Sequence, residues 1–256
     1  MLTTILAAGA AAPGTATESP YGLEAALREG GLISQSVFAI LVLMLFVSLY
    51  ILFTKLFEQQ KVINQYKRVR SGFWTANSLR EASAKLEKNS AYKQIVDDGL
   101  SAQEQHTRLT DPVEAHDWLH NSLARSEGLI VSQLKKGLSF LATVGSTAPF
   151  VGLFGTVIGI IRALVRIGSS GQASIDAVAG PVGEALIMTA VGLAVAVPAV
   201  LAFNWLQARN KKIAEDLSAF SNDILGYLAS NGAVRPVVGK PVAAKAPAAA
   251  TTTAAR

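Results

Sequence analysis

The chain has 256 residues, of which 50% are hydrophobic and only 16% charged, and its formal net charge is +5. This balance is typical of membrane spans joined to a smaller polar part. Because cysteine is absent, the composition excludes a disulfide framework, a thiolate metal site and a cysteine nucleophile.

The first 31 residues are expected to form an N-terminal arm. Their apolar opening, Met1 to Pro13, is short and has no basic residue before it, which is not the pattern of a signal peptide. Ser19-Pro20 and Gly30-Gly31 then interrupt any helix ahead of the first long apolar run. We therefore expect residues 1–31 to be an arm outside the membrane.

The first long apolar run extends from Ile33 to Phe53. A bilayer core of ~30 Å needs about 20 apolar residues in a helix, so residues 32–54 are predicted to span the membrane. The helix is predicted to continue, because four large apolar residues recur beyond it at steps of three and four: Val62, Tyr66, Val69 and Phe73.

Residues 55–137 are predicted to form a helical cytoplasmic domain. Ser78-Leu-Arg-Glu81 has the pattern of a capping box at the start of a helix, whereas Gly99 and the polar stretch 103–106 indicate a loop. Asp111-Pro112-Val-Glu114 is a further helix start.

No proline follows Pro112 until Pro149, although Gly128 and Gly137 are weak points. This pattern predicts one long helix that rises directly into the second span. At 1.5 Å per residue such a helix would be ~80 Å long.

Two more spans are expected, at residues 138–167 and 181–206, joined by a short outside loop at 168–180. A C-terminal helix is predicted at 207–232. Residues 233–256 are rich in alanine, proline and threonine, a composition typical of disorder.

Basic residues beside the spans predict the orientation. They cluster after the first span, before the second and after the third: Lys55, Lys61, Lys67, Arg68, Arg70, Lys135, Lys136, Arg209, Lys211 and Lys212. Cytoplasmic flanks carry such an excess of lysine and arginine, so the N-terminus is expected outside and the C-terminus inside. Arg162 and Arg166 lie on the opposite side, where their long side chains can reach the interface.

Glu184 is the lone carboxylate inside the third apolar run. A charge at membrane depth is costly and so marks a functional candidate, here a group that takes up and releases protons. The alternative is a place at the membrane rim, because Glu184 lies only about 20 residues before Phe203 and water would reach it there.

Thr156 and Thr189 are the hydroxyl candidates for a proton pathway. The plainer alternative is a bond from each hydroxyl back to the carbonyl four residues earlier in its own helix. Thr189 follows Glu184 by five residues, about 140° around a helix, so the two do not share one narrow stripe.

Small residues and prolines recur in the second and third apolar runs. Glycines let helices approach closely, and the candidates for packing are Gly152, Gly155 and Gly159. Pro149 and Pro198 are expected to bend their helices and shape a pore.

Other chemistry finds little support. His116 and His120 have a spacing that suits a metal, but no third ligand is evident in the sequence. We therefore expect them to belong to a polar helix face. No serine–histidine pairing or phosphate-binding loop is present, so we expect neither an enzyme, a metal site nor a cofactor.

Two segments resemble the ExbB/TolQ/MotA family of proton-channel subunits. One is Gly145-Ser-Thr-Ala-Pro-Phe-Val-Gly-Leu-Phe-Gly-Thr-Val-Ile-Gly-Ile160, and the other is Ala179-Gly-Pro-Val-Gly-Glu-Ala-Leu-Ile-Met-Thr-Ala-Val-Gly-Leu-Ala-Val-Ala-Val-Pro-Ala-Val200. The resemblance implies an all-α, three-span protein of the bacterial inner membrane. It places Glu184, Thr156 and Thr189 at the polar positions of the proton pathway, and Pro149 and Pro198 at recurrent membrane prolines.

The resemblance also implies partners and a role. Members form a pentamer around the span of a small ExbD- or TolR-like protein, and the energy passes to a TonB- or TolA-like protein that crosses the periplasm. Pro149-Phe150-Val151 favours the ExbB branch, and hence TonB-dependent import of iron-siderophores and cobalamin. The alternatives are a TolQ-like subunit that energises TolA and Pal, or a non-conducting scaffold. Membrane lipids but no nucleic acid are expected as further partners.

Overall fold

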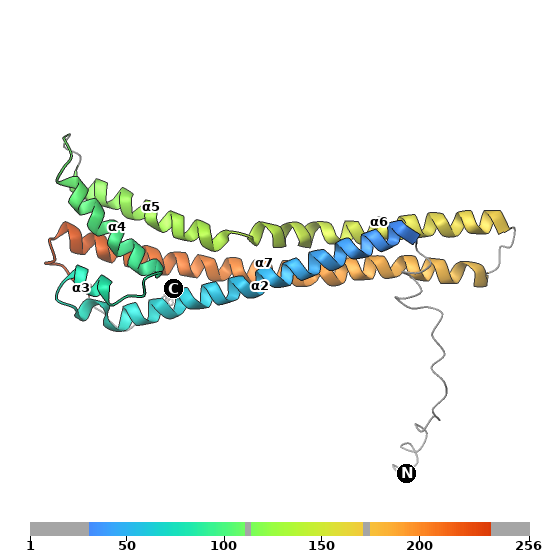
Figure 1. Ribbon diagram of the computed structural model, residues 1–256, viewed down its shortest axis with the longest axis horizontal. Coiled ribbons are helices and arrows are strands. Elements are labelled where there is room, and N and C mark those ends of the chain that lie inside the picture. Colours follow the sequence, from blue (N-terminus) through green and yellow to red (C-terminus); the bar gives the residue numbers. More distant parts are fainter. Residues whose placement is uncertain (1–30, 111–113, 171–174, 237–256) are drawn as a thin grey trace, which may run out of the picture. The chain divides into compact units, whose positions relative to one another are not determined.

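The computed structural model describes residues 31–110, 114–170 and 175–236, and side chains there except those of 170, 175–181 and 184. Every regular element in these ranges is a helix (Figure 1). In chain order they are α2 (Gly31–Gly72), the 3₁₀ turn η1 (Phe73–Thr75), α3 (Leu79–Ala84), α4 (Ala91–His106), α5 (Ala115–Lys135), α6 (Leu138–Ser170) and α7 (Ile175–Ala229). The predicted all-α class is confirmed.

Three stretches of helix are long and apolar enough to cross a membrane. They are Gly31–Thr75, Ala115–Ser169 and Ala185–Ala229, with mean hydropathies of 2.8, 1.9 and 2.4 over their most apolar parts. The prediction of three spans is confirmed. The arm at 1–30 and the tail at 237–256 lie outside the described residues.

The chain divides into two compact units. One, which we call the span unit, contains the chain up to Phe53 together with Gly137–Trp205. The other, the helical unit, contains Thr54–Lys136 and the chain from Leu206.

Small side chains dominate the core of the span unit. Its buried residues come from α2, α6 and α7: Val37, Leu41, Val144, Ala148, Val195, Ala196 and Ala199. Because alanine and valine replace larger residues, the three helices pack with little side chain between them.

Aromatic rings fill the core of the helical unit. Phe220 of α7 meets the rings of Phe73 and Tyr92 edge-on, each at 5.2 Å between centroids. Tyr66 stacks on Tyr92 at 5.7 Å. Since Val69 and Phe73 are also buried, the apolar stripe predicted beyond the first span does pack against other helices.

One helix-start signal is confirmed and another cannot be judged. The hydroxyl of Ser78 accepts a hydrogen bond from the backbone N–H of Glu81 at 3.2 Å, as the capping-box pattern predicts. Residues 111–113 lie outside the described part, and α5 begins at Ala115 after Glu114.

The prediction of a loop around residues 103–106 is wrong, because α4 continues to His106. Gly99 is buried inside this helix, and a Cβ there would lie 3.1 Å from side-chain atoms of both Leu123 and Leu228. The glycine therefore serves close packing of α4 on its neighbours and not a chain reversal.

The prediction of a single long helix from Pro112 through the second span is also wrong. The chain leaves helical geometry after Lys135, and α6 starts at Leu138. Gly137 adopts φ +86°, a backbone conformation that glycine enters without steric cost. Gly128, the other weak point, remains helical.

The continuous helix is α7, which has 55 residues and covers both the third span and the predicted C-terminal helix. It begins at Ile175, so residues 175–180 are helical where a loop was expected. Pro181 does not delimit the helix, because α7 already begins at Ile175 and continues past it.

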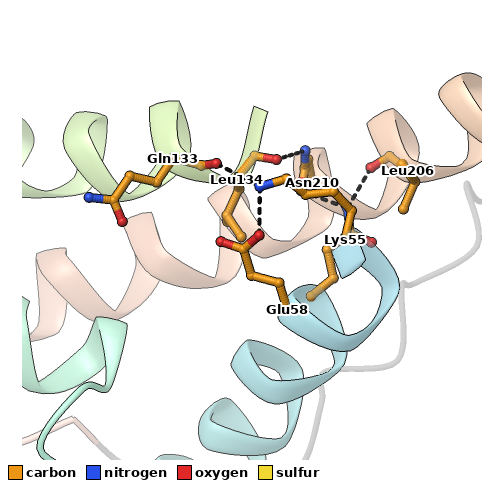
Figure 2. A network of polar contacts seen from close by, with 7 residues as sticks. Lys55, Glu58, Gln133, Leu134, Leu206 and Asn210 are labelled. Carbon is orange, nitrogen blue, oxygen red and sulfur yellow. Dashed lines mark hydrogen bonds and ion pairs between the residues drawn. The ribbon is translucent and has the colours of Figure 1, made fainter. Parts of the chain in front are cut away.

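Side chains from α2 and α7 satisfy the carbonyl groups at the end of α5 (Figure 2). Lys55 donates to the carbonyl oxygen of Gln133 at 3.0 Å, and Asn210 donates to that of Leu134 at 3.2 Å. The last carbonyls of a helix lack the donor four residues on, so these bonds stand in for it, and at Gln133 the side chain adds to a 3.2 Å bond from the N–H of Lys136.

Candidate functional site

The closest approach of α6 to α7 lies at Gly152. A Cβ atom at this position would lie only 2.6 Å from the carbonyl oxygen of Met188 and 3.1 Å from the Cα atom of Gly192. A Cβ at Gly192 would meet the carbonyl oxygen of Ala148 at 2.7 Å. Backbone therefore touches backbone here, and any side chain at either glycine would push the helices apart.

The close contact continues along α6. A Cβ at Gly159 would lie 2.7 Å from the Cβ of Ala185, and one at Gly155 would lie 3.0 Å from Val37 and 3.1 Å from Met188. Gly155 thus faces both α2 and α7.

Thr156 places a hydroxyl at this contact. Its side chain is 5% exposed, and its Oγ1 lies 3.0 Å from the carbonyl oxygen of Ala185 and 2.5 Å from the Oγ1 of Thr189. It also lies 3.2 Å from the carbonyl oxygen of Gly152 in its own helix. The structure therefore brings Thr156 and Thr189 together in the span unit.

The two hydroxyls have more acceptors around them than protons to donate. A hydroxyl has one proton and two lone pairs. Thr156 therefore donates either to a carbonyl oxygen, and accepts from Thr189, or it donates to Thr189. When the hydrogen bond between the two hydroxyls reverses, the donor becomes the acceptor and the acceptor becomes the donor. Such a pair has the chemistry of a proton-relay element.

The plainer expectation for membrane threonines holds at other positions. Thr143 and Thr147 donate to the carbonyl oxygens of Ser139 and Thr143, each four residues earlier. Thr156 makes the same local contact but adds two contacts to α7, which its sequence spacing alone did not reveal.

Glu184 belongs to α7, but its side chain is outside the described part of the structure. In sequence it directly precedes Ala185, whose carbonyl oxygen accepts the bond from Thr156. The placement of its carboxyl group stays a prediction.

Pro149 and Pro198 lie inside α6 and α7. Since proline has no N–H, the carbonyl groups of Gly145 and Ala194 lack the usual helical donor.

Much of the apolar surface of α6 and α7 is exposed in the single chain. The large exposed residues of α6 are Phe150, Leu153, Phe154, Val157, Ile161, Leu164 and Val165. Those of α7 include Leu186, Leu193, Val197 and Leu201. Such faces require lipid or other protein chains as neighbours.

In the helical unit, three carboxyl groups have raised pKa values. Burial is the main cause for Asp216 and Glu127, and the cause for Asp223. Lys212 acts against the rise at Asp216, and a hydrogen bond to Ser218 acts against it at Glu127. These groups lie outside the apolar runs.

Sequence reasoning missed the buried amides of the helical unit. Gln59 is fully buried and Asn210 is 1% exposed. Gln59 donates to Asn210 Oδ1 at 2.8 Å and to the carbonyl oxygen of Leu206 at 3.0 Å. The only signal is helical spacing, because Gln59 precedes Val62 by three residues and Asn210 follows Leu206 by four, whereas the direct neighbours of both amides are polar.

Comparison with known proteins decides the family. The profile of the MotA/TolQ/ExbB proton channel family matches residues 87–219. A protein of Xanthomonas campestris named "Biopolymer transport protein ExbB" is 37% identical over 213 residues, which cover 79% of this chain and 84% of that protein. The chain belongs to the MotA/TolQ/ExbB proton channel family.

Other family members resemble shorter parts of the chain. The "Biopolymer transport protein ExbB" of Neisseria gonorrhoeae is 48% identical over 118 residues, 46% of this chain and 54% of that protein. The "Tol-Pal system protein TolQ" of Pseudomonas aeruginosa is 35% identical over 167 residues, 63% of this chain and 71% of that protein. As a MotA/TolQ/ExbB member with three apolar helices, the chain is a transport-associated, multi-pass inner-membrane protein.

Proposed function

We propose that this chain is the ExbB-like proton-channel subunit of an inner-membrane motor that powers TonB-dependent import across the outer membrane. Its relatives named "Biopolymer transport protein ExbB" support this role. One proton crossing 100 mV releases ~2.3 kcal/mol, enough for a few protons to drive a conformational step.

The observation that carries the proposal is the threonine pair between α6 and α7. Hydroxyls in contact at membrane depth, beside a glycine-lined helix contact, supply a polar path where the surrounding residues are apolar. In the proposal Glu184 exchanges protons next to this pair, and Pro149 and Pro198 shape the passage.

The proposed assembly is a pentamer that surrounds the membrane helix of an ExbD-like partner. Exposed apolar faces of α6 and α7 support contacts with other chains or lipid. A TonB-like protein receives the released energy on the periplasmic side. The N-terminus is periplasmic and the C-terminus cytoplasmic, in line with the basic flanks.

A TolQ-like role is the second candidate, because a TolQ protein is 35% identical to this chain. In that case the partners resemble TolR and TolA, and the function is outer-membrane integrity. A non-conducting scaffold is the third, and it requires no proton exchange at Glu184.

Growth on siderophore-bound iron tests the proposal. Cells that lack their own ExbB receive the wild-type chain, Glu184→Gln, Thr156→Val or Thr156→Ser at matched membrane levels. We expect the wild type and Thr156→Ser to support growth, because serine keeps the hydroxyl. Glu184→Gln and Thr156→Val are expected to assemble but to lower iron uptake about tenfold or more.

Glu215→Gln is the matched control, since this residue is exposed on the same helix beyond the apolar run. Normal growth with Glu184→Gln and Thr156→Val would favour the scaffold. Rescue of a TolQ-deficient strain, but not of the ExbB-deficient strain, by the wild-type chain would move the assignment to TolQ.

A further inference from the structure

A groove with a volume of about 620 Å³ opens in the helical unit beside the first turn of α4. Residues of α2, of the turn before α4, of α4 itself and of α5 line it. None of these residues belongs to the threonine pair or to the apolar runs that end at Phe53 and begin at Leu138.

The N-terminus of α4 at this groove has no side-chain cap. Ser90 occupies the N-cap position in extended geometry, but its hydroxyl accepts no bond from the following turn. The first backbone bond of the helix is the one from the N–H of Gln94 to the carbonyl oxygen of Ser90. The N–H groups of residues 91–93 are therefore available to a ligand, and the helix dipole favours an anion there.

Two polar atoms that line the groove are buried without a partner. Ser90 is 4% exposed and Gln65 is 5% exposed, and neither Ser90 Oγ nor Gln65 Oε1 has a hydrogen bond in the described part of the chain. The amide nitrogen of Gln65 already donates to Glu87 at 3.2 Å, so its oxygen is left as an acceptor. Buried polar atoms normally have partners, and these two point to a bound group.

Charged side chains around the groove complete the pattern. Lys61, Lys88 and Lys93 line it, and none of them forms an ion pair with the residues that the structure describes.

Three carboxylates also line the groove, and the charge of one of them is paired by a lysine outside the lining. Glu58 is paired with Lys55, and Asp97 accepts the hydroxyl of Ser83. Asp98 is the third carboxylate of the lining. The groove thus combines an excess of available donors with two acceptors, Gln65 Oε1 and Asp98.

We infer that this groove binds a phosphate ester that also carries a hydroxyl or ammonium group. The helix N–H groups, the Ser90 hydroxyl and the three lysines suit the phosphate oxygens. Gln65 Oε1 and Asp98 suit the hydroxyl or ammonium hydrogens. A simple anion would leave both acceptors unsatisfied.

Two sources supply this chemistry, a phospholipid headgroup and a soluble phosphate ester. Lys61 follows Phe53, the end of the first apolar run, by eight residues, or about 12 Å of helix. A lysine side chain at that distance reaches the headgroup layer, which favours the lipid but leaves the shared chemistry the same.

The test uses the full chain and measures both sources. In the first arm, purified protein in detergent is titrated with glycerol 3-phosphate, and thermal unfolding is followed against glycerol and sodium sulfate at matched ionic strength. In the second arm, protein reconstituted with phosphatidylglycerol and phosphatidylcholine is re-extracted, and mass spectrometry counts the lipid molecules retained per chain.

The variants are Ser90→Ala and the double substitution Lys88→Gln with Lys93→Gln. The matched control is Lys67→Gln with Lys211→Gln, two exposed lysines of the same unit that do not line the groove. We expect the control to bind like the wild type. The groove variants should bind about tenfold more weakly, because charge-assisted or direct hydrogen bonds are lost.

Selective retention of phosphatidylglycerol identifies a headgroup as the source, and stabilisation by glycerol 3-phosphate alone identifies a soluble ester. Equal stabilisation by sulfate would show an adventitious anion only and overturn the inference. So would equal binding by the wild type and the lysine double variant, or absence of binding in both arms. If Ser90→Ala lowers the unfolding temperature equally with and without ligand, the Ser90 hydroxyl does not contact the ligand, which would overturn the inferred site at the start of α4.

Discussion

A hydroxyl in an apolar helix contact must find an acceptor, and Thr156 has three within reach. One is in its own helix and two are on α7. A bond to the helix's own backbone satisfies the hydroxyl but joins nothing together, whereas the contacts with Ala185 and Thr189 link two spans. Thr156 can reach α7 because the glycines beside it in α6 allow the two helices to approach closely.

Gly152→Ala tests how closely these residues must pack. The added methyl group would lie 2.6 Å from the backbone carbonyl oxygen of Met188, and that atom cannot rotate away. We expect a loss of about 1–3 kcal/mol in stability, by analogy with overpacked cores. Thermal unfolding in detergent measures it.

Gly168→Ala is the control for this substitution, since a Cβ there meets nothing within 4 Å. It should unfold at the wild-type temperature or slightly above, because alanine favours a helix. Equal unfolding temperatures for the two variants would contradict the close contact at Gly152.

Asp223 gives a pH-dependent prediction. Burial raises its pKa above the ordinary value of 3.8, so the folded state holds the proton more strongly than the unfolded state. Its stabilising contribution is present below about pH 4 and is lost as the pH rises through the folded-state pKa. Asp223→Asn should therefore raise the unfolding temperature at pH 7, by up to about 4 °C, and have little effect near pH 4.

Asp117→Asn, an exposed residue of α5, is the charge-matched control for Asp223→Asn. The measurement is the unfolding temperature of both variants and the wild type at the two pH values. An equal gain from Asp223→Asn at pH 4 and pH 7 would show that the gain does not come from removing a buried charge.

At the scale of elements, the break between α5 and α6 depends on how its free carbonyl groups are satisfied. Gly137 permits the turn, but the carbonyl oxygens of Gln133 and Leu134 then lose the N–H donors four residues on, and Gln133 keeps only a bond from the N–H of Lys136 at 3.2 Å. Lys55 and Asn210 replace them (Figure 2). The end of one helix is thus held by side chains from α2 and α7.

Asn210→Ala removes two hydrogen bonds, one that Asn210 donates and one that it accepts. The carbonyl oxygen of Leu134 loses a donor, and the buried amide of Gln59 loses an acceptor. Unsatisfied buried groups cost about 1–3 kcal/mol each, so a clear fall in unfolding temperature is expected.

Asn64→Ala is the matched control for Asn210→Ala, because Asn64 is exposed and makes only a local contact with Gln60. Its effect should stay within about 0.5 kcal/mol of the wild type. A wild-type unfolding temperature for Asn210→Ala would mean that water satisfies the end of α5 equally well.

At the scale of the whole molecule, orientation in the membrane follows from charge and not from the fold. The three apolar helices would cross a bilayer equally well in either direction. Lysine and arginine beside the spans favour an outside N-terminus. Single cysteines test this directly, because the natural chain contains none.

Thr15→Cys and Ser101→Cys place one reactive thiol on each predicted side. Ser101 is exposed on α4. A membrane-impermeant maleimide should label the cysteine at position 15 in intact spheroplasts, and the one at 101 only after lysis. The reverse pattern would overturn the proposed orientation, and the cysteine-free chain controls for background labelling.

Much of the fold followed from local patterns. Three apolar runs of about 20 residues predicted the spans, and the stripe ending at Phe73 predicted a continuing helix that packs on others. The errors came from glycines. Gly99 was read as a loop signal and Gly137 as a tolerated weak point, whereas the first is a packing position and the second ends a helix. Glycine serves both purposes, and only its neighbours decide between them.

For the candidate site too, the sequence predicted some features and the tertiary structure decided others. Length, hydropathy and the motifs around Thr156, Glu184 and Thr189 identified by themselves a membrane protein of a proton-channel family and the polar residues worth testing. The contact between Thr156 and Thr189 was decided by tertiary structure, because it needs two helices close enough for hydroxyls to meet. The pairing of the buried amides Gln59 and Asn210 was also decided by tertiary structure, since each finds its partner on a different helix. Local sequence determines which segments are apolar and helical, whereas packing determines which polar atoms find one another.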